Sequence, residues 1–353
     1  MIIQREELLS KLKRCLPGVE TGNSVFQGAD CFIIRNNSIL TYNTFMAVTV
    51  PFTSDISCAI PAIPFYKTVS SFKAGDITLT QEGNKLKLSC GRAKAEFTTI
   101  DEQMYERFLK IMPDAPDWKD LPVNFNTTVK SGILHGTGGG LDGVFFHGHN
   151  MLATNFIIIV NMDLGMNMDR VWLNTKAAGE LVKLPMLEKY CTNSAWIHFK
   201  TGETIFSCKK LIDDNYPEEA LLKNFEDFVQ SENSVNGTFP AELSEVLKRA
   251  AIFAEEEADA HAVHCSIEGN ILTVSSSKAI GAFSESVEIT RNDTADGKVE
   301  WKADIAQFKT AFENNPKASF YVSTVGKRSA MVFIGDNWRQ VVGLLANTKT
   351  EGK

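Results

Sequence analysis

The sequence predicts an α+β protein of three similar domains, each with two helices packed on antiparallel sheets. Three observations support this: the chain has 353 residues, one helix-and-hairpin unit fills Gly237–Thr290, and the same order of elements occurs twice upstream. A chain of this length exceeds what one hydrophobic core usually serves, so two or three domains are expected. Repetition at roughly the length of one domain favours three.

The unit at Gly237–Thr290 shows the pattern most clearly. Apolar residues recur at helical spacing in Ala241–Ala254, which predicts an amphipathic helix with one apolar stripe. Pro240 stands where the first turn of a helix tolerates proline. Val263–Ile267 and Ile271–Ser275 have strand character and are separated by Glu-Gly-Asn, so they predict a β-hairpin.

Similar blocks occur three times along the chain. Each has a short strand pattern, and successive patterns are about one domain length apart: Asn37–Thr41, Asn150–Thr154 and Asn270–Thr273. A first helix is predicted before each pattern, at Glu6–Cys15, Thr127–Leu134 and Ala241–Ala254. A second helix is predicted after each, at Ile63–Phe72, Lys176–Leu184 and Ile305–Phe312. Further strands follow at Ile77–Thr80, Lys85–Cys90, Ala95–Thr99, Trp196–Phe199, Thr204–Cys208, Phe320–Ser323 and Ala330–Ile334.

Domain boundaries are expected in polar or proline-bearing segments. Pro113–Asp117 leads into the second domain, and Glu226–Gly237, rich in Asp, Ser, Asn and Glu, leads into the third. The predicted domains are therefore 1–118, 119–232 and 233–353.

Composition and charge exclude several classes of protein. With 44% hydrophobic and 22% charged residues, the chain has the composition of a soluble globular protein. No signal peptide is expected, since the first residues turn charged at once. The longest apolar run, Phe156–Val160, is too short to cross a membrane and predicts a buried strand. A net charge of −7 argues against indiscriminate nucleic-acid binding but allows a basic face.

Seven scattered cysteines form no C-x-x-C pair. This usage is typical of a reducing cytoplasm, and it argues against a zinc ribbon or a disulfide scaffold. Localisation in the cytoplasm is therefore expected.

No set of residues in the sequence forms a recognisable catalytic site. We therefore predict no catalytic residues, no cofactor and no metal. The glycine cluster Gly136–Gly143 suggests a phosphate cradle, but it lacks the Gly-Lys-Ser/Thr ending of a P-loop, and a helix-to-strand turn is favoured. His147 and His149, like His261 and His264, have spacings that a metal uses. No His-Glu-x-x-His helix or cysteine pair supports a metal site, and exposed neighbours on a strand are the simpler interpretation.

Motifs in each third resemble the bacterial-type sliding clamp, the β subunit of DNA polymerase III. Gly91–Thr99 is close to the family's Gly-Arg-Ser-x-Phe-x-Leu-x-Thr strand, Asp213–Pro217 to its Gly-x-Phe-Pro-Asp-Tyr turn, and Leu247–Ile252 to its Leu-x-Arg-Ala-x-Ile/Leu helix. The chain departs from the family at Ala153–Ile159, usually Ala-Thr-Asp-Gly-His-Arg-Leu, and in its longer tail after Leu345. Such divergence suggests a bacteriophage-encoded or otherwise remote member.

The resemblance implies a ring-forming, clamp-type fold and no enzyme activity. Two chains would close head to tail into a homodimeric ring that encircles duplex DNA without reading its sequence. The ring would act as a processivity factor that tethers a replicative DNA polymerase, in a bacterial cell or a phage-infected host. A clamp loader and the polymerase would bind through a short peptide motif. The alternative is a clamp-fold interaction protein that forms no ring and regulates host replication.

Basic residues on the candidate helices of every repeat support a DNA-facing surface. For any single lysine, a solvated helix face is the simpler interpretation. Seven-residue spacing would put Lys176 with Lys183, and Lys302 with Lys309, on one helical face. The candidate DNA-facing residues are Lys11, Arg14, Lys67, Lys130, Lys176, Lys183, Lys248, Arg249, Lys302 and Lys309.

A second candidate site is the family's partner-peptide groove. By resemblance, the matching positions are Thr154, Ile159, Pro217, Leu222, Val342 and Leu344. Four of these would form an apolar wall, Pro217 a rigid turn, and Thr154 a hydroxyl at the rim. Ordinary core packing is the alternative for each of them. Because Phe156 and isoleucines replace the family's polar residues, the groove is expected to prefer a more hydrophobic peptide.

Overall fold

The computed structural model describes residues 1–22, 28–100, 111–113, 115–134, 141–212, 215–232, 234–257, 260–293, 297–314 and 316–345. Contacts divide the chain into two compact units. Unit 1 spans Met1–Ile133, Gly143–Phe145 and Met166–Asp213, and unit 2 spans Leu134–Asp142, Phe146–Gly165 and Asp214–Lys353. The division into three domains remains a prediction.

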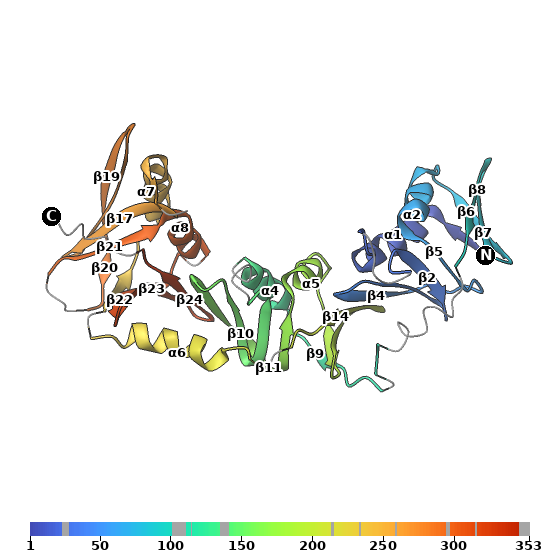
Figure 1. Cartoon of the computed structure of the whole chain (residues 1–353), viewed down its shortest axis with the longest axis horizontal. Helices are drawn as coiled ribbons and strands as arrows, with labels where there is room; N and C mark the ends of the chain where they lie inside the picture. The colour runs from blue at the N-terminus through green and yellow to red at the C-terminus, as the bar shows by residue number, and fades with distance from the viewer. Residues whose placement is uncertain are drawn as a thin grey trace. The chain divides into compact units, whose positions relative to one another are not determined.

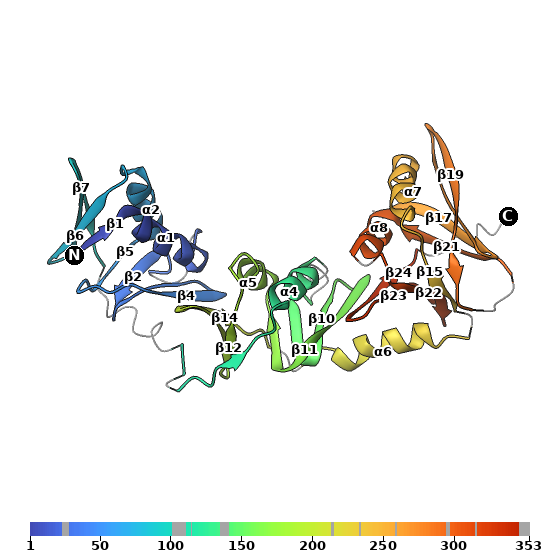
Figure 2. The same cartoon turned by 180° about the vertical axis from the view of Figure 1, so that it is seen from behind.

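Within the described residues, the α-helices occur as three contacting pairs and one separate helix (Figures 1 and 2). The pairs are α1 (Arg5–Cys15) with α2 (Ala62–Ser71), α4 (Phe125–Ile133) with α5 (Thr175–Leu181), and α7 (Leu243–Ala250) with α8 (Ile305–Asn314). The separate helix is α6 (Glu218–Val229). The three pairs match the predicted first and second helices of the three repeats.

Helix α1 shows how the sequence produces these elements. Leu8, Leu12 and Cys15 are fully buried and lie on one face of the helix. Acidic residues occupy its first turn and basic residues its last turn, as the helix dipole favours.

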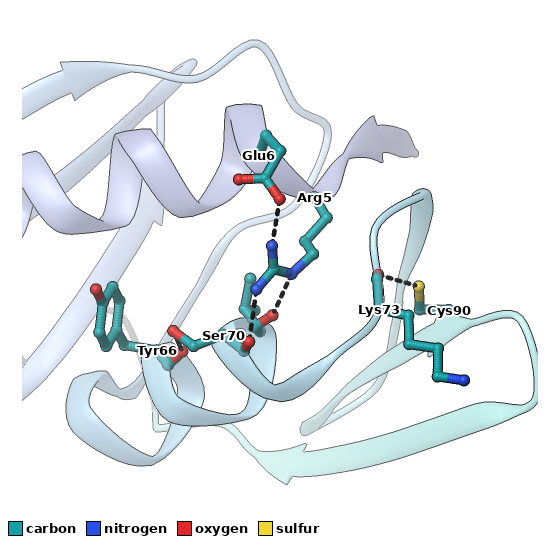
Figure 3. A network of polar contacts seen from close by, with 7 residues as sticks. Arg5, Glu6, Tyr66, Ser70, Lys73 and Cys90 are labelled. Atoms are coloured by element: carbon teal, nitrogen blue, oxygen red, sulfur yellow. Dashed lines mark hydrogen bonds and ion pairs between the residues drawn. The ribbon is translucent and has the colours of Figure 1, made fainter.

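Arg5 joins α1 to the end of α2 (Figure 3). Its Nε donates to the carbonyl of Val69 at 3.2 Å and a terminal nitrogen donates to the carbonyl of Ser70 at 2.6 Å, while Glu6 pairs with the guanidinium. The carbonyls of a last helical turn lack partners within the helix, so a cation satisfies them well. This contact helps to hold the first helix pair together.

Two antiparallel sheets lie in unit 1. The larger has the order β5-β2-β3-β4-β14-β13-β12-β9 and the smaller the order β1-β6-β7-β8. Their strands are β1 (Ile2–Gln4), β2 (Cys31–Arg35), β3 (Ser38–Tyr42), β4 (Met46–Pro51), β5 (Cys58–Pro61), β6 (Asp76–Glu82), β7 (Lys85–Cys90), β8 (Ala93–Thr98), β9 (Lys119–Asp120), β12 (Lys189–Thr192), β13 (Trp196–Thr201) and β14 (Thr204–Lys209). The larger sheet is continuous because β4 pairs with β14, with Val48 opposite Phe206.

The other two sheets lie mainly in unit 2. One has the order β10-β11-β24-β23-β22-β15-β20, and the other has β16-β17-β18-β19 with β21 paired to β17. Their strands are β10 (Val144–Thr154), β11 (Ile158–Leu173), β15 (Val235–Thr238), β16 (Glu255–Glu257), β17 (Ala260–Glu268), β18 (Ile271–Lys278), β19 (Gly281–Glu288), β20 (Thr290–Arg291), β21 (Val299–Asp304), β22 (Ser319–Val325), β23 (Arg328–Ile334) and β24 (Trp338–Gly343). The predicted hairpin of the third repeat is β17–β18, with Ile267 opposite Leu272.

An aromatic cluster fills the core of unit 2. The rings of Phe239 and Phe320 stack with centroids 3.9 Å apart, and Phe308 and Phe333 pack around them. Aromatic packing of this kind adds to the stabilisation from burial alone. Helix α6 lies against β22, β23 and β24 (Figure 1), where its buried residues are Leu221, Phe225 and Phe228.

The segment Glu226–Gly237, where a domain boundary is predicted, has regular structure at both ends. Its first residues belong to α6, and its last residues form β15. The polar composition indicated only a boundary, but an apolar stripe at helical spacing makes its first residues helical.

The predicted buried strand Phe156–Val160 is wrong in its first half. Phe156 is 61% exposed with φ of +70°, and Ile157 is 51% exposed, so β11 begins only at Ile158. The second helix of the middle repeat also ends early, at Leu181, before Pro185. In the described part of the chain, no helix is long and apolar enough to span a membrane.

Candidate partner groove and basic surfaces

A groove of about 350 Å³ in unit 2, which we term the α6 groove, lies beside helix α6. Four segments line it: the β10–β11 turn with the start of β11, helix α6, the β22–β23 turn with the start of β23, and the end of β24. The lining residues are Phe156, Ile157, Ile159, Asn224, Phe228, Lys327, Arg328, Ser329, Ala330, Val341, Gly343, Leu344 and Leu345.

Strand alternation decides which side chains reach the groove. Ile159 on β11 pairs directly with Val341 on β24, so both side chains lie on the same face of the sheet. The neighbouring pair, Ile158 and Val342, lies on the opposite face. Ile159 and Val341 therefore line the groove, and Val342 is fully buried away from it.

The β10–β11 turn is held by its own polar side chains. The Thr154 hydroxyl donates to the carbonyl of Ile158 at 2.7 Å and accepts from the amide of Phe156 at 3.0 Å. The Asn155 side chain accepts from the amides of Ile157 and Ile158. These bonds hold Phe156 at positive φ, a conformation that a bulky side chain rarely adopts. The exposed Phe156 and Ile157 consequently stand at the rim of the α6 groove.

Two cations stand on the opposite side of the α6 groove. Arg328 donates to the side-chain oxygen of Asn224 at 2.8 Å, and its guanidinium lies 5.6 Å from the ring centroid of Phe228. Lys327 precedes it in the β22–β23 turn and is exposed. The groove thus combines an apolar floor with a basic edge.

A hollow of about 690 Å³ in unit 1, the α5 hollow, brings together three lysines. Lys13 from α1 lines it with Lys176 and Lys183, which come from α5 and the turn after it. The Lys176 ammonium lies 5.3 Å from the ring centroid of Phe45, and Lys183 pairs with Glu180 at 2.6 Å. Glu20 also lines the α5 hollow, so the surplus of positive charge is small.

Comparison of the sequence with protein-family models finds no match, and comparison with curated proteins finds none either. Solved structures do match. A DNA polymerase sliding clamp from Bacillus subtilis aligns with a TM-score of 0.79 at 14% identity, over 98% of both chains. Sliding clamps bound to griselimycin align similarly. That from Bartonella birtlesii has a TM-score of 0.79 at 16% identity, and that from Pseudomonas aeruginosa 0.78 at 17%, each over 98% of this chain and 99% of the other. This chain has the sliding-clamp fold.

The resemblance inferred from the sequence is thereby confirmed for the fold, including its α+β class. The predicted groove residues can now be compared with the residues that line the α6 groove. Ile159 and Leu344 line the α6 groove, whereas Thr154, Pro217, Leu222 and Val342 do not. Pro217 is the residue before the first turn of α6, and Leu222 is partly buried on that helix. The Thr154 hydroxyl is fully buried inside its turn, so the expected position at the rim is wrong.

Sequence reasoning missed several residues that line the α6 groove. Phe228 belongs to the unpredicted helix α6, and its spacing from Leu221 and Phe225 was the signal that could have found it. Arg328 lies two residues after Gly326, a turn residue with φ of +61° between two predicted strands. Val341 could only be chosen over Val342 once the register with β11 was known.

Nine of the ten candidate DNA-facing residues divide into two sets, and the tenth, Lys302, lies on strand β21. Arg14, Lys67, Lys130 and Lys176 are exposed on helices, and none of them forms an ion pair within the described residues. Each cation of the second set pairs with a carboxylate: Lys11 with Glu7, Lys183 with Glu180, Lys248 with Glu245, Arg249 with Glu285, and Lys309 with Glu313. The hydrogen bond that Lys248 donates to Glu245 raises the pKa of the lysine. Pairing reduces the net charge that these five offer to an anion.

Two of the helical placements are wrong. Lys183 lies beyond the end of α5, and Lys302 lies on strand β21, opposite His264, before α8 begins. The seven-residue spacing therefore does not put either pair on one helical face. Lys176 and Lys183 still meet, because both line the α5 hollow.

The other sequence motifs show no shared site. Gly136–Gly140 lie outside the described residues, while Gly143 immediately precedes β10. His147 donates to Glu218 at 2.8 Å, and His149 lies 3.7 Å from Asp163, so these neighbours have different partners. No group of three potential metal ligands is found in the described ranges.

Two sheet ends have exposed or half-buried aromatic and aliphatic residues. Strand β8 ends the smaller sheet of unit 1 and carries Phe97, whose ring lies 5.4 Å from Phe65. Strand β19 ends a sheet of unit 2, where Phe283 stacks on Phe253 at 6.5 Å beside Ile280, which is 74% exposed. A strand at the end of a sheet offers unused backbone groups for pairing.

Proposed function

We propose that this protein is a DNA sliding clamp, a processivity factor that encircles duplex DNA and tethers a replicative polymerase. The observation that supports this best is the sliding-clamp fold, which matches solved clamps over 98% of the chain. The proposed activity is mechanical: the protein holds a partner on DNA and catalyses no reaction. We place it in the cytoplasm of a bacterial cell or a phage-infected host, and its free cysteines suit a reducing compartment.

We infer that the working form is a homodimeric ring of six similar domains, three from each chain at 1–118, 119–232 and 233–353. Strands β8 and β19 supply sheet ends at the first and third predicted domains. Antiparallel pairing of β8 from one chain with β19 from the other would give the unpaired backbone groups of both strands hydrogen-bond partners. It would also cover the apolar residues of both strands. Two such contacts close the ring.

Contact with DNA is proposed to be electrostatic and independent of sequence. The exposed cations Arg14, Lys67, Lys130 and Lys176 and the lysines of the α5 hollow suit contacts to phosphate groups. Contacts of this type position a protein on duplex DNA without specifying a base. A closed ring then needs little affinity, because topology keeps it on the DNA.

The α6 groove is the proposed docking site for DNA polymerase and clamp loader. Its apolar floor and polar rim suit a short peptide with apolar anchors. Of the residues first expected there, Ile159 and Leu344 remain the strongest candidates for direct contact.

The test is retention on DNA. The protein is loaded on a nicked circle, and retention is compared before and after the circle is cut. We expect retention on the circle and loss after cutting, with about a dimer mass in light scattering. Charge reversal of Arg14, Lys67, Lys130 and Lys176 to Glu together should shorten retention on the circle. Equal retention on circular and linear DNA would refute encirclement.

A second candidate is the clamp-fold interaction protein that forms no ring. The pairing of Lys248 with Glu245 and of Arg249 with Glu285 favours it, because it weakens the basic surface on α7. A strictly monomeric protein at high concentration in light scattering would select this candidate.

A further inference from the structure

The edge of the α6 groove carries positive charge with no compensating carboxylate among its lining residues. Lys327 and Arg328 both line it, and within the described residues neither forms an ion pair. The chain as a whole has a net charge of −7, yet these two cations stand together at an apolar groove. Charge complementarity therefore favours an occupant with negative charge.

Arg328 is held in place before any occupant arrives. Its hydrogen bond to Asn224 fixes one nitrogen, and the guanidinium also makes a cation–π contact with the Phe228 ring at 5.6 Å from the ring centroid. A guanidinium has five N–H donors, so several remain for a carboxylate. Because its position is already restricted, less entropy is lost when it binds a partner.

The apolar floor lies next to this cation. Ile159, Phe228 and Val341 would contact an apolar side chain, and Phe156 and Ile157 close the opposite rim. An apolar anchor seated there also displaces water from around Arg328. Reduced solvation strengthens an ion pair relative to the fully exposed case.

We propose that the α6 groove selects partner peptides that combine an apolar anchor with an Asp or Glu side chain, and that Arg328 binds that carboxylate. This inference rests on the proposed role of the groove as a docking site. Asn224 is the positioning residue for Arg328, and Lys327 adds long-range attraction. Neither the sequence resemblance nor the predicted groove residues included these three.

The test uses short synthetic peptides with two large apolar residues and one Asp, acetylated and amidated at their ends. Amidation removes the terminal carboxylate, so only the side chain carries the charge. A second peptide has Asn in place of Asp, and a third has Asn with a free C-terminus. Binding is measured by fluorescence anisotropy on the full chain at low and high salt.

We expect the Asp peptide to bind about tenfold more tightly than the Asn peptide at low salt, and the ratio to shrink as salt rises. Arg328→Gln should reduce the ratio to about one, and Asn224→Ala should reduce it in part. The matched control is Arg339→Gln, an exposed cation on β24 that does not line the groove. It should leave the ratio unchanged. Because the test compares two peptides on the same variant, a general loss of folding cannot imitate the result.

Equal binding of the Asp and Asn peptides to the wild type would overturn this inference but leave the docking role intact. So would a ratio that survives Arg328→Gln, or a preference for the free C-terminus over the Asp side chain. Absence of binding by every peptide would overturn both this inference and the proposed docking role. Retention on circular DNA tests the sliding-clamp function independently of all these outcomes.

Discussion

The amide of Gly343 donates to the carbonyl of Ile157 at 2.8 Å, and a Cβ atom at Gly343 would lie only 3.2 Å from that oxygen. Strand β24 thus approaches the β10–β11 turn so closely that a side chain at Gly343 would require the turn to shift by a few tenths of an ångström. This contact joins the β10–β11 turn at the rim of the α6 groove to the end of β24, which also lines the groove.

Gly343→Val should therefore displace the turn and destabilise unit 2 by about 1–3 kcal/mol, the usual cost of overpacking. Urea unfolding measures the change. The matched control is Gly179→Ala, because no atom lies within 4 Å of a Cβ at this position in α5. It should stabilise the protein by about 0.5–1 kcal/mol, since alanine is the better helix former. An unchanged free energy of unfolding for Gly343→Val would show that the turn shifts without loss of stability.

His198 should make stability depend on pH. It is fully buried, its Nδ1 donates to the Ser207 hydroxyl at 2.7 Å, and burial lowers its pKa to about 4. The unfolded chain binds a proton near the ordinary pKa of about 6.5. Between these values the unfolded state holds more protons, so stability is full above pH 6.5 and falls as pH drops towards 4. The expected loss is on the order of 3 kcal/mol.

The measurement is urea unfolding of the wild type and of His198→Gln at a series of pH values. Carboxylates titrate in both proteins, so the difference between the two curves isolates the imidazole. The difference should grow from pH 7 to pH 4. Parallel curves would contradict the prediction.

Gln340 should be replaceable with a gain in stability. Its side chain is fully buried on β24, and neither amide atom has a hydrogen-bond partner among the described residues. Burial of an unsatisfied polar group costs about 1–3 kcal/mol. Gln340→Leu should therefore raise the free energy of unfolding by about 1 kcal/mol, measured by thermal or urea unfolding.

Gln340→Glu is the opposite case, because it buries a charge in the same place and should destabilise the protein. If Gln340→Leu also destabilises it, the amide has a compensating role in the core.

Leu344 and Leu222 should differ in their effect on peptide binding. Leu344 lines the α6 groove and Leu222 does not. Leu344→Ala should weaken binding of an apolar peptide about tenfold, equivalent to about 1.4 kcal/mol, while Leu222→Ala should change it little. Anisotropy titration of both variants checks this, with light scattering to show that assembly is unchanged. A larger effect from Leu222→Ala would place the docking site further along α6.

The paired helices could be predicted from the sequence because each carries an apolar stripe at regular spacing, as in Leu243–Ala250. Helix α6 was missed because the polar composition after Glu226 indicated a domain boundary, while the buried stripe of the helix packs on distant strands. Lys302 was assigned to a helix because seven-residue spacing cannot show where a strand ends.

The α6 groove was predictable only in part. Ile159 and Leu344 were reached through resemblance to a family, whereas Val341 and Arg328 depend on pairings between distant strands. Register decides which of two adjacent valines faces the groove, and no local pattern contains that information.

The pairing of β11 with β24 also has a consequence for synthesis of the chain. Ile159 lies opposite Val341, so the ribosome finishes β11 long before its partner exists. At translation rates of about 5–20 residues per second, the delay is on the order of ten seconds or more. During that interval an apolar strand edge has no native partner in the nascent chain. The protein should therefore depend on chaperones while it is being made, and slower translation should increase its aggregation.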